Sequence, residues 1–372
     1  MGRKTLCLVF SLSLLLLSGC WDIEEINRRA KMDALFIDAG DKPGEIRMGG
    51  SFPVPGTQLP PITGTDQQFN KRHFVLAATG RGMVDAWDKL QASAARNIFY
   101  GQLRVLILTE RLARRNIDDR LDFVGRIPSV PPDTYVLLTK SDPVALLDMK
   151  NKANFSPGDY IELFYESDYK LMQSLPLTLW KVNIRLDNQT ADPHLAIIAP
   201  SQGMYRLAGT ALFSGARMVG ELDMRETETL ALLVGSSSGY LAVPRGREGV
   251  LGLAEVDSKT AIRPVRSPDG KVTIYVTTRI TGIIWETVPR QTELKPPDQR
   301  RIEARVAGFV KRRILRLLAK LRRLDSDPVG FGEKFRIKYP EIWAKTKWHE
   351  ILPGVDFKVK TEFTVLRTGL FK

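Results

Sequence analysis

Residues 271–284 read KVTIYVTTRITGII, and apolar and polar side chains alternate along this stretch. Such period-two alternation is typical of a β-strand with one buried face. Shorter strand-like stretches flank it, and they are expected at Tyr240–Val243, Val250–Val256, Lys259–Val265 and Asp356–Leu366. The second half of the chain is therefore expected to form mostly antiparallel strands that pack against a long helix.

That helix is expected over residues 297–324. At 100° per residue, one side carries an apolar stripe about 140° wide, made of Ile302, Val306, Phe309, Val310, Ile314, Leu317, Leu321 and Leu324. Arg313 and Lys320 intrude on this stripe. Residues 300–323 hold ten Lys and Arg residues against one acid, Glu303, so most of the net charge of +13 belongs to this segment.

The outer, basic face of this helix has three interpretations. The simplest is a solvated face on a helix that packs against its own sheet. The second is a surface for anionic lipid headgroups or an acidic partner, since each Lys or Arg near an anionic surface contributes about 1 kcal/mol. Nucleic-acid binding is disfavoured because interleaved aromatic side chains for base stacking are missing. The candidate membrane-facing or partner-facing residues are Arg305, Arg312, Arg316 and Arg323.

The first half of the chain alternates between predicted strands and helices, which indicates a mixed α/β (α+β) fold. Helices are expected at Asp85–Arg96, Glu110–Arg115, Ile117–Arg126, Asp142–Asp148 and Asp159–Gln173. The fourth would begin with Asp142 as its N-cap and Pro143 at its first helical position. Strands are expected at Ala34–Asp38, Ile46–Val54, His73–Thr79, Leu103–Leu108, Tyr135–Thr139, Leu179–Leu186 and Leu195–Ile198. The apolar run of Leu103–Leu108 suits a buried strand. We expect several domains: residues 20–199, with one or two subdomains, and residues 200–372, with the boundary at Pro200–Gly203. A hairpin around Ser214-Gly215 and a helix over Thr227–Val234 open the second region.

The N-terminus has the features of an export signal. Arg3 and Lys4 precede an apolar run, Leu6–Leu17, which is shorter than the roughly 20 residues that a helix needs to span a bilayer. Leu17-Ser18-Gly19-Cys20 resembles the bacterial lipobox, so residues 1–19 are expected to be removed and Cys20 to carry S-diacylglycerol and an N-acyl chain. The chain's other cysteine, Cys7, would leave with the signal, so no internal disulfide is expected.

The sequence contains little that predicts catalysis. His73, His194 and His349 are far apart in the sequence, and there is no H-E-x-x-H, no C-x-x-C and no P-loop. Residues 235–239 read GSSSG and are expected to form a loop. No cofactor and no metal site are predicted, and nothing in the sequence argues for an enzyme.

Three blocks of sequence together resemble the Ger(x)C lipoproteins, the C subunits of spore germinant receptors. The blocks are Cys20-Trp21-Asp22 with Glu25-Ile26-Asn27; Arg96 and Tyr100–Leu108 with Leu121-Asp122-Phe123 and Arg126; and Asp327–Gly332 with Tyr339-Pro340, Trp343, Trp348 and Gly369. The proline-rich run Ile127–Pro132 and the arginine-rich helix depart from the family pattern, and the second departure bears on which partner that helix meets.

This resemblance implies a non-enzymatic subunit held by lipid on the outer face of the spore inner membrane. It would be needed for nutrient-triggered germination and would dock on two membrane partners, the A and B subunits. The alternative is a lipid-anchored solute-binding protein that delivers a small ligand to a transporter, although two doubly wound lobes are not evident from the sequence. An enzyme that acts on the cell wall is a third, weaker alternative.

Overall fold

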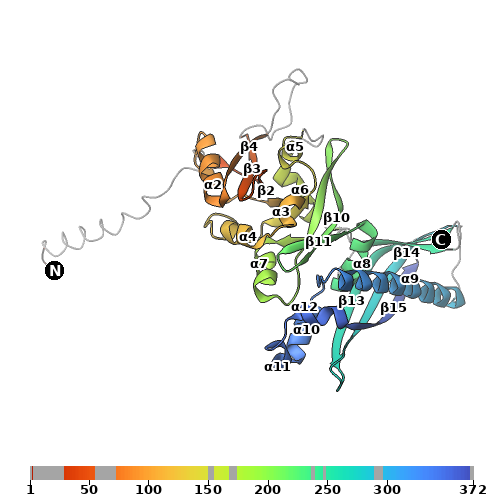
Figure 1. Ribbon diagram of the computed structural model, residues 1–372. Coiled ribbons are helices and arrows are strands. Elements are labelled where there is room, and N and C mark those ends of the chain that lie inside the picture. Colours follow the sequence, from red (N-terminus) through yellow and green to blue (C-terminus); the bar gives the residue numbers. More distant parts are fainter. Residues whose placement is uncertain are drawn as a thin grey trace.

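The computed structural model describes Gly2 and residues 29–54, 73–149, 155–166, 174–235, 239–245, 249–288 and 296–368. The expected signal peptide and Cys20 lie outside these residues. The described part contains two principal β-sheets with helices packed on them, which confirms the mixed α/β fold (Figure 1).

Within the described residues, nine strands form the larger sheet, in the order β11-β10-β9-β7-β6-β2-β3-β4, with β8 paired to β7. Antiparallel pairs lie at both sides, but β2, β6, β7 and β9 run parallel in the centre. The bounds are β2 Ala34–Ala39, β3 Glu45–Pro53, β4 His73–Arg81, β6 Val105–Thr109, β7 Tyr135–Thr139, β8 Leu177–Thr178, β9 His194–Ser201, β10 Met204–Ser214 and β11 Arg217–Leu222. A short parallel pair, β1 (Ala30–Lys31) and β5 (Ile98–Phe99), stands apart from this sheet.

Helices cover both faces of the larger sheet. Successive strand residues point to opposite faces, and Leu106 and Leu108 pack with α2 (Gly82–Ser93), α3 (Glu110–Ala113), α4 (Asp118–Gly125) and α7 (Leu179–Asn188). Val105 and Ile107 instead pack with α5 (Pro143–Leu147) and α6 (Pro157–Glu166). The continuous apolar run predicted as a buried strand is thus buried on both sides.

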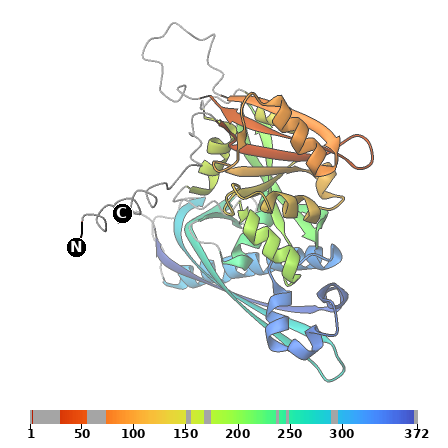
Figure 2. The ribbon, with the colours of Figure 1, turned by 90° about the vertical axis from the view of Figure 1, so that its left-hand side faces the viewer.

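The second sheet contains four strands of the described chain, in the order β12-β13-β14-β15. Their bounds are β12 Gly239–Arg245, β13 Gly249–Arg266, β14 Val272–Val288 and β15 Asp356–Thr368. The first three are antiparallel, and β15 returns parallel to β14 after the C-terminal helices. Figure 2 shows this sheet and its helices below the larger sheet.

Helices α8 (Met224–Val234) and α9 (Pro296–Arg323) share one apolar core with the second sheet. Leu212 of β10 and Leu222 of β11 enter the same core, so it is continuous with the end of the larger sheet. The expected boundary at residues 199 and 200 lies where β9 pairs with β10, and strands from both sides of it therefore belong to one sheet.

Two sequence predictions were wrong in detail. Leu179–Leu186, read as an alternating strand, is helix α7, because Leu179, Val182 and Leu186 lie on its single buried face at helical spacing. The two strands expected at Val250–Val256 and Lys259–Val265 are one strand, β13. A bulge interrupts its pairing between Ala254 and Asp257, where Glu255 has a φ of 49°.

Candidate functional site

The structure allows only some of the predicted site residues to be located. Cys20 lies outside the described residues, so its lipidation is still a prediction. Among the helices that the structure describes, none combines the length and the apolar character needed to cross a bilayer. Arg305, Arg312, Arg316 and Arg323 all lie on α9, as expected.

Helix α9 has an apolar face and a basic face. Val306, Val310 and Ile314 are completely buried in the core shared with the second sheet. Leu318 joins this face although the helical stripe drawn from the sequence omitted it. The stripe therefore fixes the rotation of the helix, with the predicted basic face toward solvent.

The two cations that intrude on the apolar stripe bind acids of α8. Arg313 pairs with Glu228 at 3.2 Å, and Lys320 pairs with Glu226 at 2.6 Å. Arg313 also donates to the hydroxyl of Thr229 at 2.9 Å and to the carbonyl of Arg225. These inner cations therefore hold α9 against α8.

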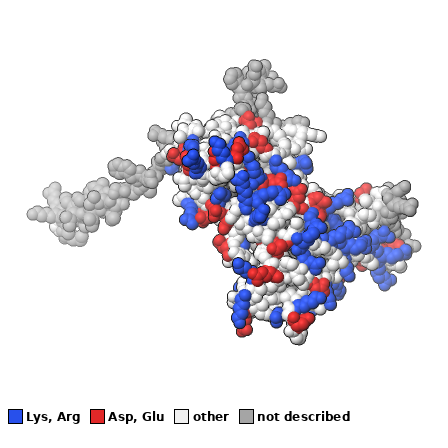
Figure 3. All heavy atoms as spheres, in the orientation of Figure 1, with Lys and Arg blue, Asp and Glu red and all other residues white. Residues whose placement is uncertain are grey.

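The outer cations differ from the inner ones. Arg305, Arg312, Arg316 and Arg323 are exposed, and no carboxylate of the described chain forms an ion pair with them. Leu315 lies among them and is 40% exposed. Figure 3 shows Lys and Arg side chains gathered along the surface formed by α9. This face can meet an anionic surface without first breaking an internal ion pair.

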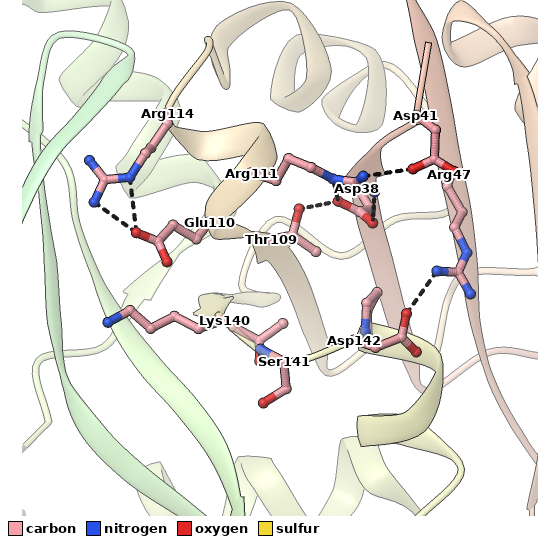
Figure 4. Close-up of a pocket in the computed structure, with 12 residues that line it drawn as sticks. Asp38, Asp41, Arg47, Thr109, Glu110, Arg111, Arg114, Lys140, Ser141 and Asp142 are labelled. Atoms are coloured by element: carbon pink, nitrogen blue, oxygen red, sulfur yellow. Dashed lines mark hydrogen bonds and ion pairs between the residues drawn. The ribbon is translucent and has the colours of Figure 1, made fainter.

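A second candidate site is a pocket of about 580 Å³ at the carboxyl ends of the parallel strands (Figure 4). Three elements end at it: β2 near Asp38, β6 at Thr109 and β7 at Thr139. Its lining is polar and contains four cations and four carboxylates: Asp38, Asp41, Arg47, Thr109, Glu110, Arg111, Arg114, Thr139, Lys140, Ser141, Asp142 and Pro143.

Asp38 and Arg111 form the fixed part of this pocket. The Asp38 carboxylate is only 6% exposed, accepts a hydrogen bond from Thr109 and pairs with Arg111 at 2.7 Å. Arg111 also pairs with Asp41 at 2.8 Å. The two carboxylates, Asp38 foremost, raise the pKa of Arg111, so its guanidinium stays charged.

The carboxylates of the remaining ion pairs are all more exposed than Asp38. Arg47 pairs with Asp142 at 2.8 Å, Arg114 pairs with Glu110 at 2.7 Å, and Lys140 pairs with Glu221 at 2.6 Å. Asp142 also caps α5 by accepting from the backbone N–H of Ala145 at 2.8 Å, as its position before Pro143 predicted.

The C-terminal block with the sequence DPVGFG has a structural role centred on Asp327. This buried carboxylate accepts hydrogen bonds from the N–H groups of Gly330, Phe331 and Gly332 and from the Trp348 indole, at 2.7 to 3.0 Å. Burial raises the pKa of Asp327 to about 6. Gly330 has a φ of 85°, and a Cβ on Gly332 would lie 2.8 Å from the Thr190 carbonyl oxygen.

Asp192 links this block to the first half of the chain. Its carboxylate accepts from the backbone N–H of Asp327 at 2.6 Å and from that of Gly215 at 2.7 Å. His349 lies 3.3 Å from Asp192 and 3.0 Å from Asp325. These two acids, Asp192 foremost, raise the pKa of His349 to about 9.

The other two histidines belong to the packed interior. His73 lies 2.7 Å from the Leu147 carbonyl oxygen, and burial lowers the pKa of His194. In the part of the chain that the structure describes, no group of three His, Cys, Asp or Glu residues is arranged to hold a metal ion.

Sequence reasoning did not identify the pocket. Its signal lies in the polar residues that directly follow two buried apolar strands: Thr109-Glu110-Arg111 after one, and Thr139 to Asp142 after the other. The carboxyl ends of adjacent parallel strands lie at one edge of a sheet. The parallel pairing needed to use this rule was not evident from the sequence.

Comparison with known proteins shows that the chain is similar to spore germination proteins over nearly its whole length. Residues 22–200 match the family described as Spore germination protein N-terminal domain, and residues 208–369 match Spore germination B3/GerAC like, C-terminal. Spore germination protein B3 of Bacillus subtilis (strain 168) is 24% identical over 366 residues, which cover 96% of each chain. Spore germination protein GerQC of Bacillus cereus is 20% identical over 387 residues, which cover 100% of this chain and 99% of that protein.

A solved structure has the same fold. The crystal structure of the GerBC protein aligns with 93% of this chain and 100% of its own, with a TM-score of 0.58 and 18% sequence identity.

Proposed function

Because the chain belongs to the spore germination GerAC family, we propose that it is the lipid-anchored, non-enzymatic C subunit of a spore germinant receptor. The observation that carries the proposal is the order and extent of the two family regions, 22–200 and 208–369, which together span nearly the whole chain. In this role the chain is needed for nutrient-triggered germination, and it docks on the A and B membrane subunits.

Lipid at Cys20 anchors the protein on the outer face of the spore inner membrane. The support is the Leu17–Cys20 lipobox and the signal-like residues before it. Cys20→Ala is expected to leave the folded body intact and to move the protein out of the membrane fraction. Retention of the variant in membranes washed with high salt would contradict this anchor.

The outer face of α9 contributes to docking. Its support is the contrast between the inner cations, which already pair with α8, and Arg305, Arg312, Arg316 and Arg323, which are exposed. Charge reversal at Arg312 and Arg316 is expected to lower the association of the chain with membranes or with the receptor complex. Reversal of Lys358 and Lys360 on β15 provides a control with the same change in net charge. If the α9 double variant and the β15 double variant associate equally well, the outer face of α9 is only a solvated surface and does not contribute to docking.

No catalytic step is assigned to the chain. Nothing in the sequence argues for an enzyme, and the carboxylates of the pocket are paired with cations. Peptidoglycan hydrolysis by the purified protein that disappears in Glu110→Gln or Asp142→Asn would contradict a non-enzymatic role. The solute-binding alternative is not proposed, because the two principal sheets of the described residues, with nine and four strands, do not form two doubly wound lobes.

Affinity purification of the chain from spore inner membranes, with chemical cross-links mapped onto its residues, tests the proposal. Two integral membrane proteins are expected to co-purify, with cross-links to lysines of this chain. Recovery of the chain alone under conditions that preserve other membrane complexes would contradict the receptor role.

A further inference from the structure

The polar pocket occupies the position at which sheets of this kind bind ligands. Strands β6 and β7 are parallel neighbours. The chain leaves β6 into α3 on one face of the sheet and leaves β7 into α5 on the other face. The two connections therefore diverge, and the crevice between them lies outside the carboxyl ends of the strands. In open α/β sheets, ligands bind in crevices outside the carboxyl ends of the strands, and this pocket lies in that position.

The size and chemistry of the pocket restrict what it can hold. Its volume of about 580 Å³ suits a small molecule rather than a macromolecular segment. Its lining is polar, and its four cations balance its four carboxylates. Such a site offers no excess of positive charge for a polyanion, nor a cluster of free carboxylates for a metal ion.

The pairing of these charges favours a ligand that carries both a positive and a negative charge. A lone anion at Arg47 would leave the carboxylate of Asp142 without its cation, and a lone cation at Asp142 would leave Arg47 without its anion. A zwitterion replaces both partners at once. The side chains of Arg47 and Asp142 are 31% and 49% exposed, and an ion pair so open to solvent contributes little to stability.

The parts of the pocket that stay fixed support this exchange. Asp142 keeps one carboxylate oxygen on the Ala145 N–H, so the other oxygen is held in place whether Arg47 or a ligand ammonium binds it. Arg47 lies over the Phe36 ring at 5.9 Å, which restrains its guanidinium. The Asp38 carboxylate is 6% exposed, and its pair with Arg111 forms a floor that need not open.

We propose that this pocket binds a small zwitterion of the α-amino-acid class, with the ligand carboxylate on Arg47 and its ammonium group on Asp142. The site goes beyond the receptor role and does not depend on it, since binding is measured on the isolated full chain.

Thermal unfolding and calorimetry of the full chain in detergent, with a panel of α-amino acids as probes, test this proposal. At least one amino acid is expected to raise the Tm in a saturable manner. Acetate and methylammonium, which supply its two charged halves separately, are expected to have no effect at the same concentrations. No response to any amino acid, or an equal response to acetate alone, would overturn the proposal.

Two variants locate the binding. Asp142→Asn keeps an oxygen that caps α5 but removes the charge that would hold the ammonium group. This variant is expected to stay folded and to raise the Kd at least tenfold. Arg47→Gln is expected to raise the Kd by a similar factor. Arg279→Gln, which breaks an exposed pair with Glu362 on the other sheet, is the matched control and should leave Kd unchanged. Equal Kd values for D142N and the unmodified chain would refute the assignment.

Discussion

At the scale of single residues, Asp327 organises the C-terminal helices. One carboxylate satisfies three consecutive backbone N–H groups and one indole in the interior. Asp327→Ala would leave these buried donors without their acceptor, and we expect it to lower the free energy of unfolding by about 3–5 kcal/mol. Urea denaturation measures this loss. Asp269→Ala in the exposed turn before β14 is the control, and it is expected to change the free energy of unfolding much less. Similar losses for both variants would contradict the role of Asp327.

His349 predicts how stability depends on pH. Its pKa of about 9 in the folded chain exceeds the value near 6.5 of an unfolded histidine, so folding favours its protonated form. Its contribution is complete below about pH 6.5 and is lost as the pH rises through 9. The side chain is 29% exposed, so solvent screening limits the loss to about 1–2 kcal/mol.

Denaturation at pH 6.5 and pH 9.5 measures this dependence. The difference in unfolding free energy between the unmodified chain and His349→Gln should be larger at the lower pH and should shrink at the higher one. A difference that stays constant over this range would show that the histidine does not titrate as described.

Contacts between residues close in sequence could be predicted at this scale, whereas contacts between residues far apart in sequence could not. Asp142 was expected to cap a helix because the cap lies next to the helix in sequence, and this was confirmed. Asp38 and Arg111 are 73 residues apart and come together through the pairing of β2 with β6. Their partnership depends on strand register, which one sequence does not specify.

At the scale of elements, α9 shows that neighbouring arginines have different roles. Arg313 is 12% exposed and binds α8, whereas Arg312 is exposed. Arg313→Ala is expected to lower the free energy of unfolding by about 1–3 kcal/mol, since it removes a partly buried charge-assisted network. Arg312→Ala should change it by less than about 0.5 kcal/mol. Equal losses in urea denaturation would contradict the assignment of inner and outer faces.

Helical periodicity was informative where it extended over many residues. The apolar stripe of α9 repeats over about six turns, and it predicted both the buried face and the intruding cations. Over the ten residues of α7 the same reasoning failed, because a short apolar pattern fits a strand as well as a helix. The bulge at Glu255 made β13 look like two strands, since it shifts which residues face the core.

At the scale of the whole molecule, the two sheets form one continuous body. The core of the second sheet includes residues of β10 and β11, and Asp192 joins the turn at Gly215 to the Asp327 block. The pocket in the larger sheet and the basic face of α9 are thus separate surfaces of one structure. The proposed ligand site and the proposed docking face can therefore be altered independently by mutation.

Nutrient-triggered germination of spores that lack this chain tests the central claim most directly. Deletion of the gene in its native spore former is expected to abolish or slow germination with one class of nutrient, and the unmodified gene should restore the response. Restoration by the Cys20→Ala variant should be weaker, because that chain is expected to leave the membrane. Normal germination of the deletion spores with every nutrient tested would contradict the account.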